Sequence, residues 1–381
     1  MTWQDHAERL AATVTGCGSR WRPAVAAVPR HEFVPVWWDT PEGSPFGVWE
    51  LCEGQADEAA WMRAAYSDQT LITQVGGVHA DEAKTGARVN GRPTSSSTMP
   101  GLVVRMLDHG DLYPGADVLD VATGSGYSAG LMAHVLGDDK VTSIDVDPYL
   151  TETAATRLHG IGLRPKVLTC DATGPLPGRY DRIVSMVSVK PIPASWLEAL
   201  KPGGRLVTVL AHTSLIVTAT KTDDGGAVGR IAPDWAMFMP ARQVGDYPPK
   251  LNEVFELANT REGESVDQGR YPLVDVASAW ELQSMLEVVA PGIEHRFEEK
   301  PDGRRTAWML HADGSWARAV ADGEELPMVH QGGRRRLWDE LDDIREYWLR
   351  TGALPLRGAR VFILPDGVIR LWRSGWKRVI R

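Results

Sequence analysis

The residues best suited to chemistry lie in the stretch 117–127, which reads DVLDVATGSGY. Its apolar run 118–121 predicts a short buried strand, and 123–126 is a glycine-rich turn. Residues 127–136 have the spacing of small and apolar side chains that is typical of a helix. Glycines let a backbone approach a ligand closely, and the first turn of a helix offers free N–H groups. The stretch therefore predicts a nucleotide-binding unit of strand, turn and helix.

Further predicted strands bring acidic residues to the same edge of a sheet. Residues 141–145 end in Asp145, about 20 residues after the turn, where a doubly wound sheet places an acid against a ribose. Asp171 and Ala172 follow the next strand in the same way. The remaining predicted strands are 166–170, 180–185 and 205–210, the last of them preceded by Lys-Pro-Gly-Gly.

This series resembles the class I S-adenosylmethionine-dependent methyltransferases, whose glycine motif is acid-x-Gly-x-Gly-x-Gly. Ala122 stands at the first glycine of that motif. The resemblance implies a Rossmann-like α/β domain with S-adenosyl-L-methionine as its cofactor. The residues that it assigns to cofactor binding are Asp120, Thr123, Gly124, Ser125, Gly126, Tyr127, Asp145, Asp171 and Ala172.

Two alternatives remain open at this site. A dehydrogenase needs Gly-x-Gly-x-x-Gly or Ala, and Gly124, Gly126 and Ala129 satisfy that spacing. The Pro-Gly-Gly turn before a late strand favours the methyltransferase instead. Asp171 has a second interpretation as the cap of an Asx turn.

Residues 27–35, AVPRHEFVP, resemble the N-terminal signature of the protein L-isoaspartate O-methyltransferase family. The resemblance covers roughly residues 1–243. That family carries Gly-x-Thr-Ile-Ser-x-Pro where this chain has 91–100, GRPTSSSTMP. Alignment on Pro100 places Thr98 at the active-site serine of the family and Ser97 at its isoleucine. The resemblance therefore implies Ser97 and Thr98 as the catalytic residues.

The polar run 91–100 is expected to be a loop at a helix N-terminus, because it is too polar for a strand and Pro93 argues against a helix. Hydroxyls, backbone N–H groups and a helix dipole all favour an anion, so the run suits carboxylate binding. A solvated linker is the alternative. The residues that we expect to contact the substrate are Ser95 and Ser96 here, and Ser188 and Lys190 in the loop 187–193.

Length and pattern predict three parts, because 381 residues exceed one ordinary core. Residues 1–100 form an N-terminal helical cap with the substrate loop, 101–243 the cofactor domain, and 250–381 a C-terminal α+β domain. The segment 37–90 is expected to be irregular. Its four tryptophans either line a peptide groove or pack a small satellite core. In the tail, we expect hairpins over 306–320 and 360–372 and an amphipathic helix over 334–350 that ends at Gly352.

Composition and charge bear on several classes of function. The net charge of −9 gives no basic footprint for nucleic acid, although Arg334 to Arg336 and the basic end of the chain mix cations with aromatics. No apolar run approaches 18 residues and the first residues lack a signal pattern, so we expect neither a membrane span nor secretion. The three cysteines form no metal-like pair, and no histidine shows ligand-like pairing. The sequence predicts a cytoplasmic protein without a metal site.

A carboxylate nucleophile is already ionised near neutral pH, so methyl transfer to it requires positioning more than acid–base help. The family resemblance implies either repair of isoaspartate or esterification of a normal aspartate in a peptide natural product. The second use leads to aspartimide and isoaspartate. The altered hydroxyl run, the Ser188–Lys190 loop and the added Trp-rich tail favour it. We therefore expect a ribosomally made, already macrocyclised precursor peptide as the partner, held by the C-terminal domain. A degenerate, non-catalytic peptide-binding protein is the third possibility.

Overall fold

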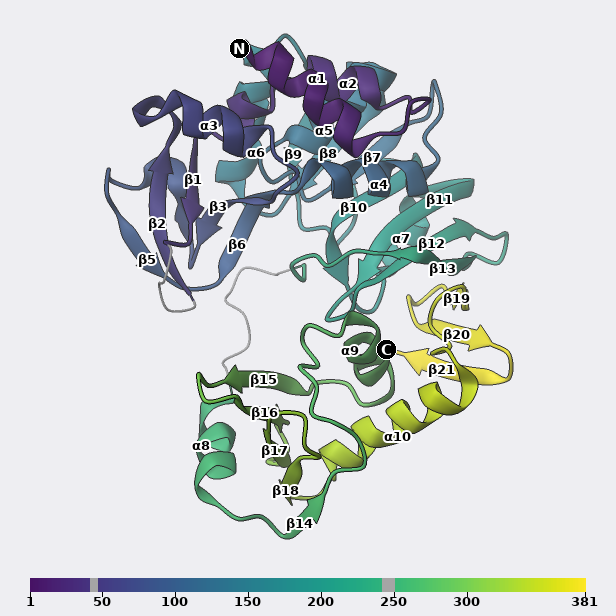
Figure 1. Ribbon diagram of the computed structural model, residues 1–381. Coiled ribbons are helices and arrows are strands. Elements are labelled where there is room, and N and C mark those ends of the chain that lie inside the picture. The colour runs from purple at the N-terminus through teal and green to yellow at the C-terminus, as the bar shows by residue number, and fades with distance from the viewer. Residues whose placement is uncertain (42–46, 242–250) are drawn as a thin grey trace.

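The candidate site is built on a mixed sheet of ten strands (Figure 1), seen in a computed structural model that describes residues 1–41, 47–241 and 251–381. The strand order is β21-β20-β19-β13-β12-β11-β10-β7-β8-β9. The strands from β11 to β9 are parallel and the others are antiparallel. Their bounds are β7 Val118–Val121, β8 Val141–Asp145, β9 Lys166–Thr169, β10 Tyr180–Val189, β11 Leu200–Leu210, β12 Leu215–Lys221, β13 Ala227–Trp235, β19 Arg360–Ile363, β20 Ile369–Arg373 and β21 Trp376–Ile380.

Both faces of this sheet are covered by other elements. Alternate residues of each strand point to opposite faces, so one strand contributes side chains to both apolar clusters. On β7, Val118 joins one apolar cluster with α4 and α5, whereas Leu119 joins another with α7 and the C-terminal elements. The helices are α4 Pro100–Gly110, α5 Tyr127–Leu136, α6 Pro148–Gly160 and α7 Ala194–Ala199, with a 3-10 turn η4 at Asp138–Lys140. The predicted strands and the glycine turn are confirmed, and β12 and β13 form an antiparallel hairpin beside them.

The N-terminal segment caps the sheet as expected. It consists of α1 Trp3–Val14, α2 Arg22–Ala27 and the 3-10 helix η1 Arg30–Phe33. The Thr2 hydroxyl accepts a hydrogen bond from the backbone N–H of Asp5, which begins α1. Phe33 lies against Gly130 of α5, where an added Cβ would come within 3.2 Å of its ring. The absence of a side chain on Gly130 therefore lets the cap approach the cofactor domain closely.

The segment 37–90 was wrongly expected to be irregular, because strands within 36–41 and 47–97 form a second sheet of six antiparallel strands. The strands are β1 Val36–Asp39, β2 Val48–Glu53, β3 Leu71–Val75, β4 Val78–His79, β5 Arg88–Asn90 and β6 Pro93–Ser97, joined by η2 Gly54–Ala56, α3 Glu58–Ala65 and η3 Ala80–Glu82. The polar run at 93–97 was therefore wrongly expected to be a loop. It pairs with β3, with Leu71 opposite Ser97 and Ile72 opposite Ser96. Backbone pairing with a distant strand supplies the order that its side chains do not indicate.

The packing interpretation of the tryptophans in this segment is confirmed. Trp38 is 1% exposed and forms a satellite core with Leu51, Val75 and Ala80. Trp49 packs against the same cluster, whereas Trp37 and Trp61 join the cluster beneath the N-terminal cap.

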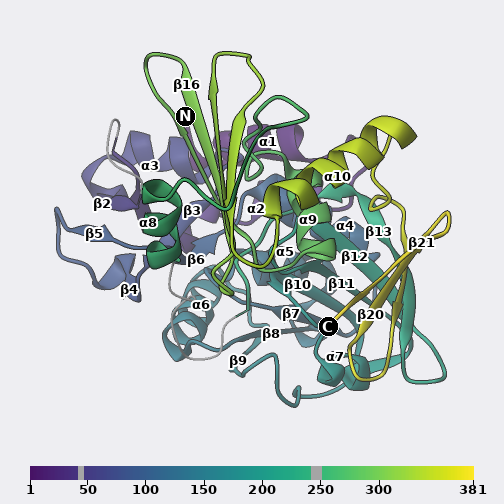
Figure 2. The same cartoon turned by 90° about the horizontal axis from the view of Figure 1, so that it is seen from below.

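The tail contains a five-stranded antiparallel sheet ordered β14-β18-β17-β16-β15. Figures 1 and 2 show α8 and α10 on either side of this sheet. The elements are α8 Asn252–Thr260, β14 Ser265–Gln268, α9 Trp280–Val289, β15 Glu294–Glu299, β16 Arg304–Leu310, β17 Trp316–Asp322, β18 Met328–Gly332 and α10 Leu337–Thr351. Both expected hairpins are present, and Gly352 ends α10 with a φ of 76°.

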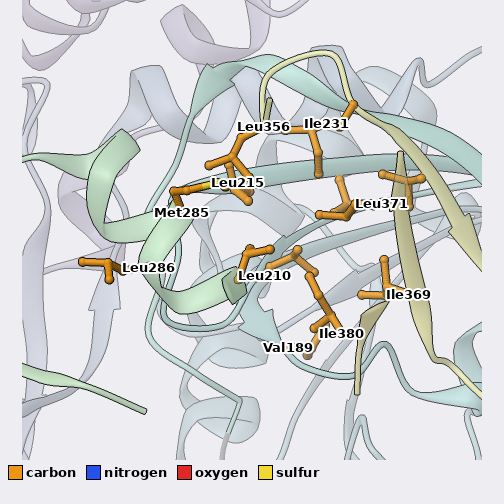
Figure 3. Packing of buried hydrophobic residues seen from close by; sticks show 14 of the residues in the cluster. Val189, Leu210, Leu215, Ile231, Met285, Leu286, Leu356, Ile369, Leu371 and Ile380 are labelled. Carbon is orange, nitrogen blue, oxygen red and sulfur yellow. The ribbon is translucent and has the colours of Figure 1, made fainter. Parts of the chain in front are cut away.

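The expected boundary near residue 250 does not separate two cores. Strand β19 pairs with β13 and so extends the main sheet with the end of the chain. One apolar cluster joins Leu215 and Ile231 of the cofactor domain with Met285 of α9 and Leu371 of β20 (Figure 3). An added Cβ on Gly367, in the β19–β20 turn, would lie 1.9 Å from the Ile192 carbonyl oxygen. The tail is therefore packed into the catalytic body.

Candidate active site

A cavity opens at the carboxyl ends of β7, β8 and β10, the edge where open α/β sheets bind ligands. Its lining falls into three groups. The glycine turn and the acids after β8 and β9 form one side. Hydroxyl residues of β6 form another, and apolar residues complete it: Val103, Met186, Val187, Met239, Pro240 and Ala241.

The glycine turn has the backbone that its residue types require. Gly124 and Gly126 have φ values of 52° and 92°, in the left-handed region that glycine enters readily. Ala122 has a φ of 73°, which explains why the motif usually has glycine there. The backbone N–H groups of Ala122 and Thr123 both donate to the Ile144 carbonyl, at 2.9 and 3.0 Å, and tie the turn to β8.

Asp120 supports the turn from below and is not among the residues that line the cavity. Its carboxylate is fully buried and accepts hydrogen bonds from Ser143 at 2.8 Å and from Ser128 at 3.0 Å. Burial raises the pKa of Asp120 to about 7. Thr123 reaches the same network, with its hydroxyl 2.7 Å from that of Ser143. The network holds the glycine turn in place.

Asp145 lies at the cavity, where the sequence predicts a ribose contact. It accepts hydrogen bonds from the backbone N–H groups of Gly124 at 3.0 Å and Asp147 at 3.2 Å. Burial raises its pKa, while these hydrogen bonds oppose the rise. Asp147 lines the cavity as well and lies 3.1 Å from the buried His79, which links the second sheet to this edge.

Asp171 and Ala172 also line the cavity. Asp171 accepts from both the backbone N–H and the hydroxyl of Thr173 at 2.8 Å, so it forms the Asx turn of the alternative interpretation while remaining at the site. The indole N–H of Trp196 donates to the Ala172 carbonyl at 2.7 Å. A buried tryptophan from α7 therefore fixes this loop, a contact that sequence spacing did not reveal.

The hydroxyl residues of β6 face the glycine turn. Ser95, Ser96 and Thr98 line the cavity, and an added Cβ on Gly124 would come 3.1 Å from the Ser96 carbonyl oxygen. The Ser95 hydroxyl accepts from Thr73 at 3.1 Å. Ser97 differs from its neighbours, because it is 1% exposed and does not line the cavity.

Ser188 and Lys190 are not brought to the cavity. The Ser188 hydroxyl donates to the Phe238 carbonyl at 3.1 Å, and the residue is buried at 1% exposure. Lys190 forms an ion pair with Glu287 of α9, so it connects the cofactor domain to the tail. Both residues take part in internal contacts, and the substrate role predicted for them has no support in their position.

The wall formed by Met239, Pro240 and Ala241 was not predicted from the sequence. This segment follows β13 and returns to the end of β10, where the Ser188 N–H donates to the Met239 carbonyl at 3.0 Å. No motif marks it, because only the tertiary fold brings it to the cavity. Within the three described ranges, no residue group fit to hold a metal ion is found, and no helix is long and apolar enough to cross a membrane.

The parallel strands, the glycine turn and the acid after β8 together define a class I methyltransferase type of domain. Residues 60–243 match the family model described as Protein-L-isoaspartate(D-aspartate) O-methyltransferase. A protein-L-isoaspartate O-methyltransferase of Methanopyrus kandleri is 30% identical over 229 residues, which cover 57% of this chain and 83% of that protein. The chain belongs to the protein-L-isoaspartate(D-aspartate) O-methyltransferase family.

Other relatives match over shorter regions. The protein-L-isoaspartate O-methyltransferases of Hyperthermus butylicus and Pyrococcus horikoshii are 32% and 36% identical, over 39% and 33% of this chain. These matches span 66% and 60% of the two relatives. A solved structure titled protein-L-isoaspartate O-methyltransferase is 16% identical, with 99% of both chains covered and a TM-score of 0.48. A Plasmodium falciparum relative solved with S-adenosyl-L-homocysteine is 14% identical over 64% of this chain and 99% of that one, with a TM-score of 0.45.

Proposed function

We propose that this protein is an S-adenosylmethionine-dependent O-methyltransferase that esterifies an aspartate side-chain carboxylate in a ribosomally made, modified peptide. The observation that carries the proposal is that one cavity is lined by two kinds of surface. The glycine turn and Asp145 form one part of the lining, and the hydroxyl residues Ser95 and Ser96 of β6 and Thr98, just after it, form another. The family membership supports carboxylate as the acceptor.

The cavity residues fit the proposed cofactor. The left-handed backbone at Gly124 and Gly126 leaves the turn open to a ligand, and Asp145 offers a carboxylate for ribose hydroxyls. Asp171 and Ala172 line the same cavity, and we assign the adenine edge of the cofactor to them. When bound, S-adenosylmethionine supplies an electrophilic methyl group. Its demethylated product, S-adenosyl-L-homocysteine, is bound in the Plasmodium falciparum relative.

The protein side of the mechanism is positioning and exclusion of water. Among the described lining residues there is no lysine, arginine or histidine, so a bound carboxylate meets neutral donors. Hydroxyls of β6 orient the anion by hydrogen bonds, and apolar residues such as Met186 and Met239 remove water from it. An aspartate carboxylate is ionised at neutral pH and needs no base.

The ester sets up the next reaction without further help from the enzyme. The backbone amide nitrogen of the following residue attacks the ester carbonyl, methanol leaves and a succinimide forms. Hydrolysis of this aspartimide gives aspartate or isoaspartate. Two departures from the family support a precursor peptide as the substrate: the Thr-Ser-Ser-Ser-Thr run of β6, and a tail whose tryptophan-containing sheet extends beyond the residues that match the family model.

Repair of isoaspartate in damaged proteins is the second candidate, and the names of the relatives favour it. The two are separated by incubating the full chain with S-adenosylmethionine and either an isoaspartyl peptide or an Asp-containing macrocyclic precursor. We expect mass spectrometry to show gain of one methyl group and then loss of methanol on the precursor only. Methylation of the isoaspartyl peptide alone would assign repair.

A further inference from the structure

Arg30 is buried behind the hydroxyl wall of the cavity and joins three parts of the chain. It lies in η1, is 0% exposed, and donates to the carbonyls of Ala65, the last residue of α3, at 2.8 Å and of Gln69, shortly after α3, at 2.8 Å. It also donates to the carbonyls of Ser97 at 3.2 Å and Thr98 at 3.3 Å, where β6 ends. One side chain therefore ties the substrate wall to the N-terminal cap.

The charge of Arg30 is unusually placed. In the part of the chain that the structure describes, its hydrogen bonds all end on carbonyl oxygens and none on a carboxylate. Burial lowers its pKa to about 10, which leaves the guanidinium protonated at neutral pH. The Asp68 carboxylate, whose charge favours that protonated form, accepts from the backbone N–H of Gly101 at 2.7 Å. A buried cation without a direct anionic partner is normally destabilising, so an anion nearby would be favoured.

Three hydrogen-bond donors at this position lack acceptors within the described residues. They are the Arg30 Nε–H, the Ser97 hydroxyl and the Tyr127 hydroxyl. Tyr127 is 2% exposed, lines the cavity, and has its ring centre 5.7 Å from the Arg30 Cζ. Buried donors usually have partners. A positive, donor-rich patch behind Thr98 therefore points to an acidic ligand on the other side of that wall.

Building on the proposed carboxylate methylation, we propose that Arg30 is a positioning residue for the acceptor carboxylate. It holds Thr98 and the end of β6 against the glycine turn, and its charge, with the hydroxyl of Tyr127, attracts the anion to that wall. The lining itself has no cation among the described residues, so the attraction comes from behind the hydroxyls.

The test compares four full-length variants: Arg30→Gln, which removes the charge; Arg30→Lys, which keeps it; Tyr127→Phe, which removes only the hydroxyl; and the control Arg157→Gln. Arg157 also anchors η1, since it donates to the Phe33 carbonyl at 3.1 Å, but it pairs with Asp81 and lies outside the cavity lining. The readouts are S-adenosyl-L-homocysteine affinity by calorimetry, amide hydrogen exchange over 94–99, and kcat and KM with the isoaspartyl and precursor peptides.

We expect Arg30→Gln to raise the KM for whichever peptide the wild type methylates by about tenfold or more. Arg30→Lys should bring this KM most of the way back to the wild-type value. Tyr127→Phe should raise KM by about threefold to tenfold. Exchange over 94–99 should accelerate in Arg30→Gln and stay as in the wild type in Arg157→Gln, with cofactor-product affinity within about twofold in the three arginine variants.

Equal exchange over 94–99 and equal KM in Arg30→Gln and Arg157→Gln would overturn the proposal. If the wild type methylates neither peptide, the proposed function fails, whereas the exchange comparison still decides whether Arg30 positions β6. If Arg30→Gln does not fold, the other two variants decide. A wild-type KM in both Arg30→Lys and Tyr127→Phe would overturn a role for this patch in carboxylate binding, whereas a raised KM in Tyr127→Phe would support it.

Discussion

At the scale of single residues, the cofactor turn was largely predictable because its chemistry depends on local backbone geometry. Thr123, Gly124 and Asp145 lie where spacing places them. The role of Asp120 was not predictable, since burial beneath the turn depends on Ser128 and Ser143 from two other elements. Arg30 was visible only as part of a family signature, because its five carbonyl acceptors come from distant segments.

Ala122→Gly should stabilise the protein by about 1 kcal/mol, because Ala122 has a φ of 73° that alanine adopts at a penalty. The free energy of unfolding in urea measures the change. The control is Ala12→Gly on the exposed face of α1, which should lose about 1 kcal/mol. Destabilisation by both substitutions would show that the turn does not strain residue 122.

Asp120 should make stability depend on pH. Its folded-state pKa of about 7 lies above the ordinary 3.8, so the folded state holds the proton more tightly. The contribution to stability is therefore greatest at low pH and falls as the pH rises from about 4 through 7. Asp120→Asn lacks this titration. Between pH 5 and 8, the free energy of unfolding of Asp120→Asn should therefore rise relative to that of the wild type, by on the order of a few kcal/mol at most. Urea unfolding at each pH measures the difference. A constant difference would contradict the raised pKa.

At the scale of elements, the strands of the main sheet were predictable and the second sheet was not. The buried strand β7 has apolar residues in sequence, whereas β6 consists of proline, threonine and serines. Strand β6 is polar because it lines the cavity, and it is ordered because it pairs with β3, whose residues lie 18 to 26 positions earlier in the chain. The residue pattern of one segment alone shows neither its place at a cavity nor its pairing with a distant strand.

Gly124→Ala should weaken binding of S-adenosyl-L-homocysteine by about tenfold, because its Cβ would lie 3.1 Å from the Ser96 carbonyl and push β6 away from the turn. Gly115→Ala is the matched control. Gly115 also has a positive φ, of 87°, but nothing lies within 4 Å of an added Cβ. Both variants should lose stability, and only Gly124→Ala should lose affinity by calorimetry. Equal affinities would argue against a close contact between β6 and the turn.

At the scale of the whole molecule, the chain is less divisible than its sequence indicates. Strands β19–β21 continue the main sheet, and α9 shares its core. The Asp-Gly turn and flanking strands at 360–372 were predictable, whereas their partner β13 was not, because strand pairing over this distance has no local signal. A deletion ending near residue 243 would expose β13 and the core, so it does not isolate a recognition role for the tail.

Leu371→Ala should destabilise the catalytic body by about 2 to 5 kcal/mol, because Leu371 is 1% exposed in the shared core. The neighbouring Trp372→Ala, at a residue that is 43% exposed, should change stability by less than about 1 kcal/mol. Thermal unfolding with S-adenosyl-L-homocysteine present should give one transition that shifts down in Leu371→Ala. Two separate transitions, with the ligand-stabilised one unmoved, would show that the tail folds on its own.

We propose above all that the protein transfers a methyl group to an aspartate carboxylate in the cavity lined by the glycine turn and β6. Single-turnover mass spectrometry tests it most directly, with S-adenosylmethionine, an Asp-containing macrocyclic precursor, and its Asp→Asn form as the control. We predict one methyl group on the Asp precursor, followed by loss of methanol, none on the Asn form, and a rate at least about tenfold lower for Thr98→Val. An unmodified Asp precursor, or equal methylation of the Asn form, would contradict the claim.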